Sequence, residues 1–101
     1  MPFLIRLFKR NMEGPMVSKS VVFECEYDLQ MKAVAVLVQK ASALHSTVYV
    51  TRDGRRANAK SLLGVMSLGI ENGVEVEISA EGGDEQEAVD VLAGFLQNPK
   101  V

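Results

Sequence analysis

One serine at the start of a short apolar run is the residue of this chain best placed to do chemistry. Ser61 directly precedes Leu62 and stands where a helix N-cap would stand, and Gly69 stands where a glycine would end that helix. A phosphate on Ser61 would meet unpaired backbone N–H groups and the positive end of the helix dipole. The pattern therefore predicts either a simple capping serine or a serine that accepts a phosphate.

The run that follows Ser61 carries more apolar side chains than one short helix can bury on one face. These side chains are Leu62, Leu63, Val65, Met66 and Leu68. Exposed leucine and methionine commonly mark a surface that binds another protein. We therefore expect Leu62, Leu63 and Met66 to contribute to a partner-binding surface.

A longer helix is predicted from Met31 to Leu44, because apolar residues recur there at helical spacing. The stripe that would face the core consists of Ala33, Val34, Leu37, Val38, Ala41 and Leu44. Met31, Ala35 and Val36 fall outside this stripe. We expect these three residues to extend the apolar surface formed beside Ser61.

The stretch around Ser61 also resembles a known protein family. Residues 58–69 read N-A-K-S-L-L-G-V-M-S-L-G and closely resemble the regulatory-serine segment of HPr phosphocarrier proteins of the phosphotransferase system. The resemblance extends from Val21 to about Leu96. In that family the junction before the first helix reads G-L-H-A-R-P-A, and its histidine takes a phosphoryl group from a phosphoenolpyruvate-dependent enzyme. The present chain reads D-L-Q-M-K-A-V-A, so the resemblance places Gln30 at the histidine position and Lys32 at the arginine position.

This altered junction removes the groups that histidine phosphotransfer needs. The carboxamide of Gln30 is not a nucleophile for phosphoryl transfer, and Lys32 lacks the bidentate fork of arginine. Ala33 replaces the proline, and the only histidine, His45, lies at the far end of the predicted helix, where we expect a surface residue or a dipole partner. We therefore expect a degenerate phosphohistidine site at Gln30 and Lys32 and no enzymatic activity.

The resemblance is strongest to the Crh-type HPr-like regulatory paralogues, which also carry glutamine in place of the histidine. It implies that an HPr kinase/phosphorylase phosphorylates Ser61, and that the modified protein binds a LacI-type catabolite repressor and regulates transcription in bacterial carbon catabolite repression. Lys60 is close enough in sequence to help balance the new charge. Two alternatives stay open: an adaptor that binds phosphotransferase-system proteins without being phosphorylated, and an ordinary phosphocarrier protein HPr.

The order of the patterns predicts an α+β fold, βαββαβα, with a four-stranded antiparallel sheet and three helices on one face. Asp53-Gly54 predicts a tight hairpin between the two middle strands. The resemblance implies the open-faced sandwich of the HPr family. The strands are expected at Val21–Tyr27, Thr47–Thr51, Arg56–Ala59 and Val74–Ala80.

The last helix is expected to begin with a capping box formed by Asp84 and Glu87. Its core-facing residues are predicted to be Ala88, Val91, Leu92 and Phe95.

Composition narrows the function classes. The chain has 101 residues, 48% of them hydrophobic and 24% charged, as in one small globular domain. A net charge of −2 argues against electrostatically driven nucleic-acid binding. Cys25 is the only cysteine, so an intrachain disulfide is excluded and a cytoplasmic location is favoured. One cysteine and one histidine argue against a zinc site, and we expect no metal or other cofactor.

Residues 1–15 differ from the remainder, because M-P-F-L-I-R-L-F-K-R is apolar and basic. This run is too short to span a bilayer and lacks the features of a secretory signal. It is interpreted either as an amphipathic contact with a membrane or partner, or as a start-site extension, since the chain from Met16 looks like the usual beginning of an HPr-type protein. We expect residues 1–15 to be a poorly ordered extension and residues 16–101 to form the HPr-like domain.

Overall fold

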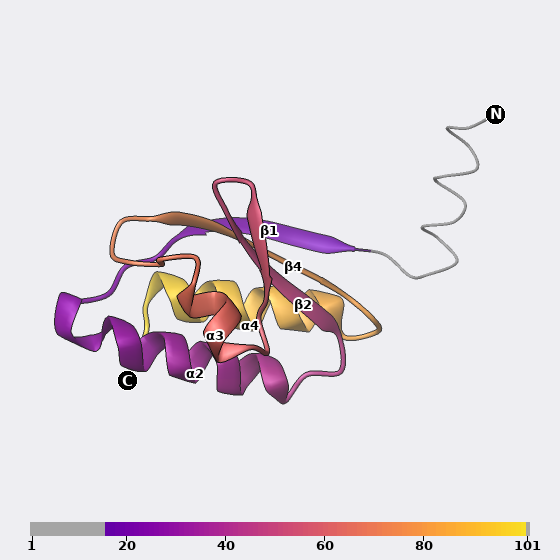
Figure 1. Ribbon diagram of the computed structural model, residues 1–101. Coiled ribbons are helices and arrows are strands. Elements are labelled where there is room, and N and C mark those ends of the chain that lie inside the picture. The colour runs from indigo at the N-terminus through magenta and orange to yellow at the C-terminus, as the bar shows by residue number, and fades with distance from the viewer. Residues whose placement is uncertain (1–15, 101) are drawn as a thin grey trace.

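The computed structural model describes residues 16–100, so the predicted N-terminal extension and Val101 lie outside the described range. Figure 1 shows the elements of the described part. In chain order they are β1 (Val17–Val22), the 3-10 helix η1 (Tyr27–Leu29), α2 (Gln30–Ser42), β2 (Thr47–Arg52), β3 (Arg55–Asn58), α3 (Leu62–Met66), β4 (Glu75–Glu81) and α4 (Glu85–Gln97).

The four strands form one antiparallel sheet in the order β1-β4-β2-β3. Ile78 on β4 pairs with Val50 on β2, and both side chains are buried. The β2–β3 hairpin turns through Asp53 and Gly54, whose φ angles are +52° and +76°. Positive φ at both central residues is the requirement of a type I′ turn, which explains why the Asp-Gly dipeptide marked this hairpin correctly.

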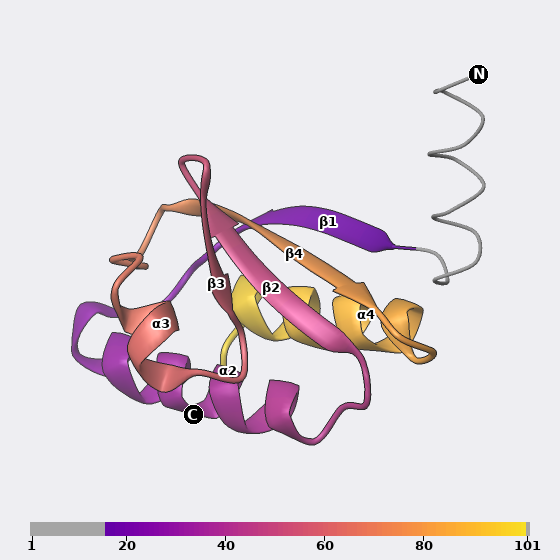
Figure 2. The ribbon, with the colours of Figure 1, turned by 45° about the vertical axis from the view of Figure 1, so that its right-hand side comes forward.

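All three α-helices lie on one face of the sheet, whereas the other face carries no helix within residues 16–100 (Figures 1 and 2). The core lies between the two layers, where β-branched residues of the sheet meet leucines and alanines of the helices. The predicted fold is therefore confirmed: an α+β sandwich of a four-stranded antiparallel sheet and three helices.

The first strand is displaced from its predicted position. It begins at Val17 and ends at Val22, and only Phe23 continues the pairing, through its N–H to the Val74 carbonyl at 2.9 Å. Tyr27, the last residue of the predicted strand, lies in η1 with 86% of its surface exposed. The alternation of residue types continues beyond the point where the sheet partner ends, and therefore the pattern misled the prediction.

The core-facing side of α4 also differs from the prediction. Val91 is exposed, Phe95 is only partly buried, and the helix instead buries Val89, Ala93 and Leu96 beside Ala88 and Leu92. A helix with many small apolar residues offers two overlapping stripes of similar spacing. Contact with the sheet selects one of them.

The predicted capping box at the start of α4 is wrong. The Asp84 side chain makes no capping hydrogen bond to its own helix. Its carboxylate accepts hydrogen bonds from the backbone N–H groups of His45 and Ser46, each at 2.9 Å, and from the Ser46 hydroxyl. The carboxylate thus joins α4 to the segment that leads into β2.

Candidate functional site

Ser61 caps α3 as predicted. Its backbone is extended, with φ −109° and ψ 110°, and its Oγ accepts a hydrogen bond from the Gly64 N–H at 3.1 Å. A Cβ atom on Gly64 would lie 3.2 Å from this oxygen, closer than most Cβ contacts. The glycine therefore leaves the space that the serine hydroxyl needs.

The carbonyl end of α3 is held by two arginines from the β2–β3 hairpin. Arg52 donates from Nη1 to the Leu68 carbonyl at 3.0 Å and to the Gly69 carbonyl, and Arg55 donates to the Leu68 carbonyl at 3.4 Å. Gly69 has a φ of +69°, which ends the turn after the helix. Positive charge at the C-terminal end complements the helix dipole. The hairpin thereby helps to fix the orientation of the segment that begins at Ser61.

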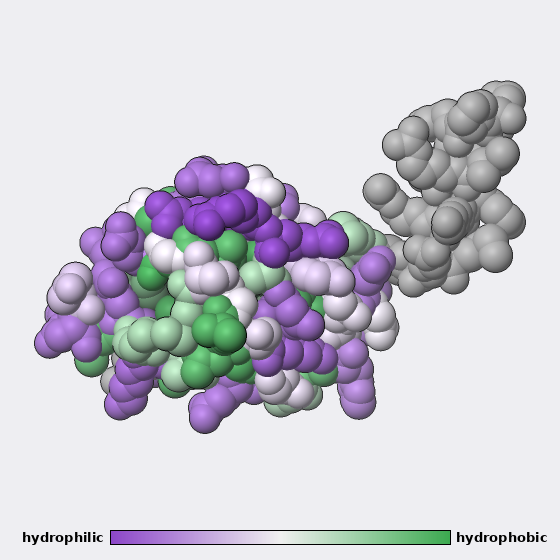
Figure 3. Space-filling view, in the orientation of Figure 1, coloured by the Kyte–Doolittle hydropathy of each residue, from purple (hydrophilic) through white to green (hydrophobic). Residues whose placement is uncertain are grey.

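The apolar run of α3 divides into a buried and an exposed part. Val65 and Leu68 belong to the core. Leu62, Leu63 and Met66 are exposed, and Leu63 is 79% exposed. Figure 3 shows hydrophobic surface gathered where α3 lies beside α2. The structure therefore confirms that this short helix has more apolar residues than it can bury.

The start of α2 lies beside the end of α3 and forms an open groove of about 490 Å³, here called the Gln30 groove. Met31 and Met66, both predicted as partner-binding residues, line the groove together. The full lining is Tyr27, Asp28, Gln30, Met31, Val34, Met66, Ile70 and Glu71. The other predicted partner-binding residues, Ala35, Val36, Leu62 and Leu63, do not line it.

Sequence reasoning missed Glu71 and Ile70 as groove residues. They follow α3, and tertiary hydrogen bonds hold their loop against the segment after β1. The Cys25 N–H donates to Asn72 Oδ1 at 2.9 Å, and further bonds continue this connection. No local pattern in the sequence announces such a contact, because the two segments are far apart along the chain.

Lys32 and Lys60 do not line the Gln30 groove. Lys32 is exposed on α2 and does not line the groove. The Nζ atom of Lys60 donates to the Leu44 carbonyl at 2.8 Å, just beyond the C-terminal end of α2. One donor of the Lys60 ammonium is therefore already bound to an acceptor at the end of α2.

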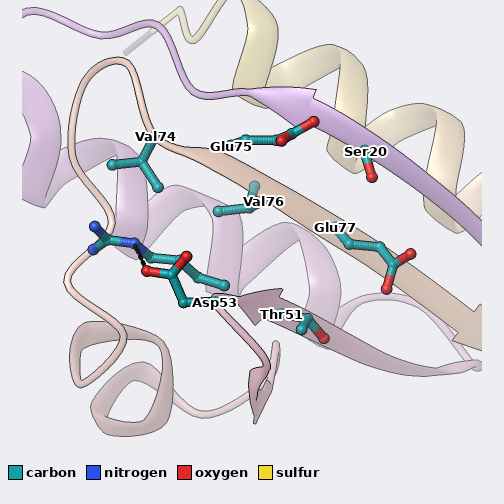
Figure 4. Close-up of a pocket in the computed structure, with 8 residues that line it drawn as sticks. Ser20, Thr51, Asp53, Val74, Glu75, Val76 and Glu77 are labelled. Carbon is teal, nitrogen blue, oxygen red and sulfur yellow. Dashed lines mark ion pairs between the residues drawn. The ribbon is translucent and has the colours of Figure 1, made fainter.

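A second, smaller hollow of about 350 Å³ lies on the face of the sheet that carries no helix. Figure 4 shows Glu75 and Glu77 on β4 with Ser20 and Thr51 on the neighbouring strands. Within residues 16–100, no three histidine, cysteine or carboxylate side chains are grouped so that they could hold a metal ion.

A family model for the "PTS HPr component phosphorylation site" matches residues 17–98. This chain belongs to the HPr family. The HPr-like protein Crh of Bacillus subtilis is 42% identical over 82 residues, which are 81% of this chain and 96% of Crh. The crystal structure of phosphocarrier protein HPr from Bacillus anthracis is 39% identical, with a TM-score of 0.77 over 81% of this chain and 98% of that protein. The solution structure of Bacillus subtilis Crh is also 39% identical, with a TM-score of 0.63 over 83% of this chain and all of Crh.

These similarities confirm the resemblance to HPr and Crh-type proteins and the HPr-like fold. Members of the HPr family are phosphocarrier or regulatory proteins rather than catalysts in the usual sense. Membership in this family suggests partners related to the phosphotransferase system. In the described part of this HPr-family chain, no helix has the length and apolar character needed to cross a membrane.

Proposed function

We propose that this HPr-family protein is a regulator that acts by binding other proteins through its α2–α3 surface and is switched by phosphorylation of Ser61. The observation that carries the proposal is the position of the Ser61 hydroxyl at the start of the helix that exposes Leu62, Leu63 and Met66. A phosphate would add about −1.5 to −2 charges and three strong acceptor oxygens beside this apolar surface. A partner with an arginine next to an apolar pocket would then bind the modified form more tightly.

The same proposal assigns no histidine phosphotransfer to Gln30. Gln30 begins α2, and its carboxamide carries no nucleophilic nitrogen, while Lys32 lies outside the groove. The similarity to Crh, an HPr-like protein, supports a regulatory rather than a carrier role. We infer an HPr kinase/phosphorylase as the modifying enzyme, a LacI-type catabolite repressor as the main partner, and a cytoplasmic location.

A second candidate function is an adaptor that binds phosphotransferase-system proteins without being phosphorylated. Two observations favour it. The Ser61 hydroxyl already serves as the cap of α3, and the Lys60 ammonium is bound to the Leu44 carbonyl. Phosphorylation would alter the cap, and the Lys60 ammonium already has another acceptor.

Phosphorylation assays with an intact-mass readout separate these candidates. The purified protein is incubated with an HPr kinase and ATP, and in parallel with a phosphoenolpyruvate-driven phosphotransfer mixture. If the protein is the proposed regulator, the kinase should add one phosphate and the phosphoenolpyruvate mixture none. Ser61→Ala should abolish the addition of phosphate by the kinase.

The matched control is Ser67→Ala at the other end of α3, where the exposed Ser67 hydroxyl donates to the Gly64 carbonyl at 2.6 Å. This variant should still accept the phosphate. An unmodified wild-type protein would leave the adaptor as the better candidate. A phosphate from the phosphoenolpyruvate mixture would show that the assignment of Gln30 is wrong.

A further inference from the structure

The Gln30 groove combines an apolar floor with an acidic rim. Val34 and Ile70 are buried beneath it, and the flexible side chains of Met31 and Met66 stand exposed along it. The charged residues among its lining are Asp28 and Glu71, both exposed, and no lysine or arginine lines it. Methionine adapts its shape to different apolar groups, so such a floor can receive more than one kind of side chain.

The two rim carboxylates are not used by neighbouring side chains. Within residues 16–100, neither Asp28 nor Glu71 has an ion-pair partner, and neither side chain makes a hydrogen bond. Burial raises the pKa of the nearby Cys25 thiol, and the negative charges of Glu26 and Asp28 raise it further. Both carboxylates are therefore available to a ligand that approaches the groove.

The wall that carries Glu71 is tied to the segment that leads to Asp28. Phe23 exchanges two backbone hydrogen bonds with the loop between α3 and β4. Its N–H donates to the Val74 carbonyl at 2.9 Å, and its carbonyl accepts from the Gly73 N–H at 2.8 Å. A third bond joins the Cys25 N–H to Asn72. These bonds hold the backbone of the two segments that carry Asp28 and Glu71 side by side before a ligand arrives, which lowers the entropic cost of binding.

Charge selects the chemistry of the ligand. A phosphoryl group or another anion entering the Gln30 groove would meet Asp28 and Glu71 with no cation in the lining to compensate. A lysine or arginine would instead find two carboxylate acceptors, and its apolar neighbours would cover Met31 and Met66. The groove thus suits a cationic and apolar protein segment, such as one face of an amphipathic helix.

We propose that the Gln30 groove docks a partner segment in which a lysine or arginine stands beside apolar side chains, the cation pairing with Asp28 and Glu71. This inference rests on the proposed function only in treating the α2–α3 surface as a protein-binding surface. It requires no phosphate on Ser61. It also predicts a second electrostatic anchor for a partner of the phosphorylated protein, separate from the arginine that would meet Ser61.

The test is an NMR titration of the unphosphorylated, ¹⁵N-labelled full chain at low ionic strength. The probe is a synthetic twelve-residue amphipathic peptide with leucines on one face and arginines flanking them, and the comparison peptide has glutamate in place of each arginine. We expect saturable shifts of the Met31, Met66 and Glu71 amides with the arginine peptide. The double variant Asp28→Asn/Glu71→Gln should bind it about three- to tenfold more weakly, as for two exposed ion pairs.

The matched control is Glu75→Gln/Glu77→Gln, which removes the same charge from the hollow on the open face of the sheet (Figure 4). This variant should bind the arginine peptide like the wild type, and so should Ser61→Ala, so that a failed titration and a failed kinase assay are separate results. Equal binding of the two peptides, equal weakening by the two double variants, or the absence of saturable shifts would each overturn the proposal.

Discussion

Asp84 joins the start of α4 to the start of β2 through Ser46. One carboxylate oxygen accepts hydrogen bonds from the N–H group and the hydroxyl of Ser46, and Ser46 is fully buried. The other oxygen accepts from the His45 N–H at 2.9 Å. The Ser46 hydroxyl, followed by the His45 N–H, lowers the pKa of Asp84 from 3.8 to about 2. These bonds favour the ionised carboxylate in the folded protein.

Asp84→Asn is expected to lower the stability of the protein at neutral pH, because an amide is a weaker acceptor for these three donors. Since the folded-state pKa lies below the unfolded-state value, the contribution is complete above the ordinary pKa of 3.8 and is lost as the pH falls towards about 2. Urea unfolding at several pH values measures it. The difference in unfolding free energy between wild type and variant should disappear as the pH falls from 4 to 2.

The control for this prediction is Asp90→Asn, also on α4, where the carboxylate accepts one exposed hydrogen bond from Gln86 at 3.1 Å. It should change the unfolding free energy by less than about 0.5 kcal/mol. If Asp84→Asn destabilised the protein equally down to pH 2, the hydrogen bonds to the ionised carboxylate would not explain the loss of stability.

Gly64→Ala is expected to slow phosphorylation of Ser61. The added methyl group would lie 3.2 Å from Ser61 Oγ, so the hydroxyl would have to shift. Gly94→Ala is the matched helical control, because a Cβ at Gly94 meets no atom within 4 Å. Alanine there should stabilise α4 by about 0.5–1 kcal/mol without affecting the kinase. Equal phosphorylation rates in both variants would show that the space beside Ser61 is not needed.

Arg52→Met should loosen α3 at its carbonyl end. It removes the hydrogen bonds to the Leu68 and Gly69 carbonyls and should cost about 1–2 kcal/mol of stability. Hydrogen exchange of the Val65 and Gly69 amides would report the loosening. As a control, Arg56→Met removes a guanidinium that lies 4.0 Å from the centre of the Tyr49 ring, on another part of the hairpin. Faster exchange in Arg56→Met as well would argue against a specific role for Arg52.

Leu63→Ser should separate partner binding from stability. Leu63 is 79% exposed, so its replacement should change the unfolding free energy by less than about 0.5 kcal/mol. If the proposed function holds, binding of the Ser61-phosphorylated protein to the proposed catabolite-repressor partner should nevertheless weaken, as measured by calorimetry. The buried Leu68 gives the opposite control: Leu68→Ala should cost about 2–5 kcal/mol of stability. Unchanged repressor affinity in Leu63→Ser would exclude this part of α3 from the interface.

Local chemistry made several features readable from the sequence alone. Ser61 was predicted as the cap of α3, and Asp53-Gly54 as a tight hairpin, since each depends on a few consecutive residues. The order of strands and helices followed from residue periodicity, and so did the excess of apolar residues on α3. In each case the deciding interaction lies within a few residues along the chain or within a single element.

Tertiary structure alone decided the features that depend on distant partners. β1 ends at Val22 because its partner strand β4 begins at the paired residue, Glu75. Contact with the sheet decides which side of α4 is buried. The sequence predicted that the Asp84 side chain caps α4, but in the fold its carboxylate accepts hydrogen bonds from the N–H groups of His45 and Ser46. Glu71 joins Asp28 on the rim of the Gln30 groove only because the loop after α3 is bonded to the segment after β1. Residue type indicates what a side chain can bind, but packing between distant segments determines which partner comes within reach.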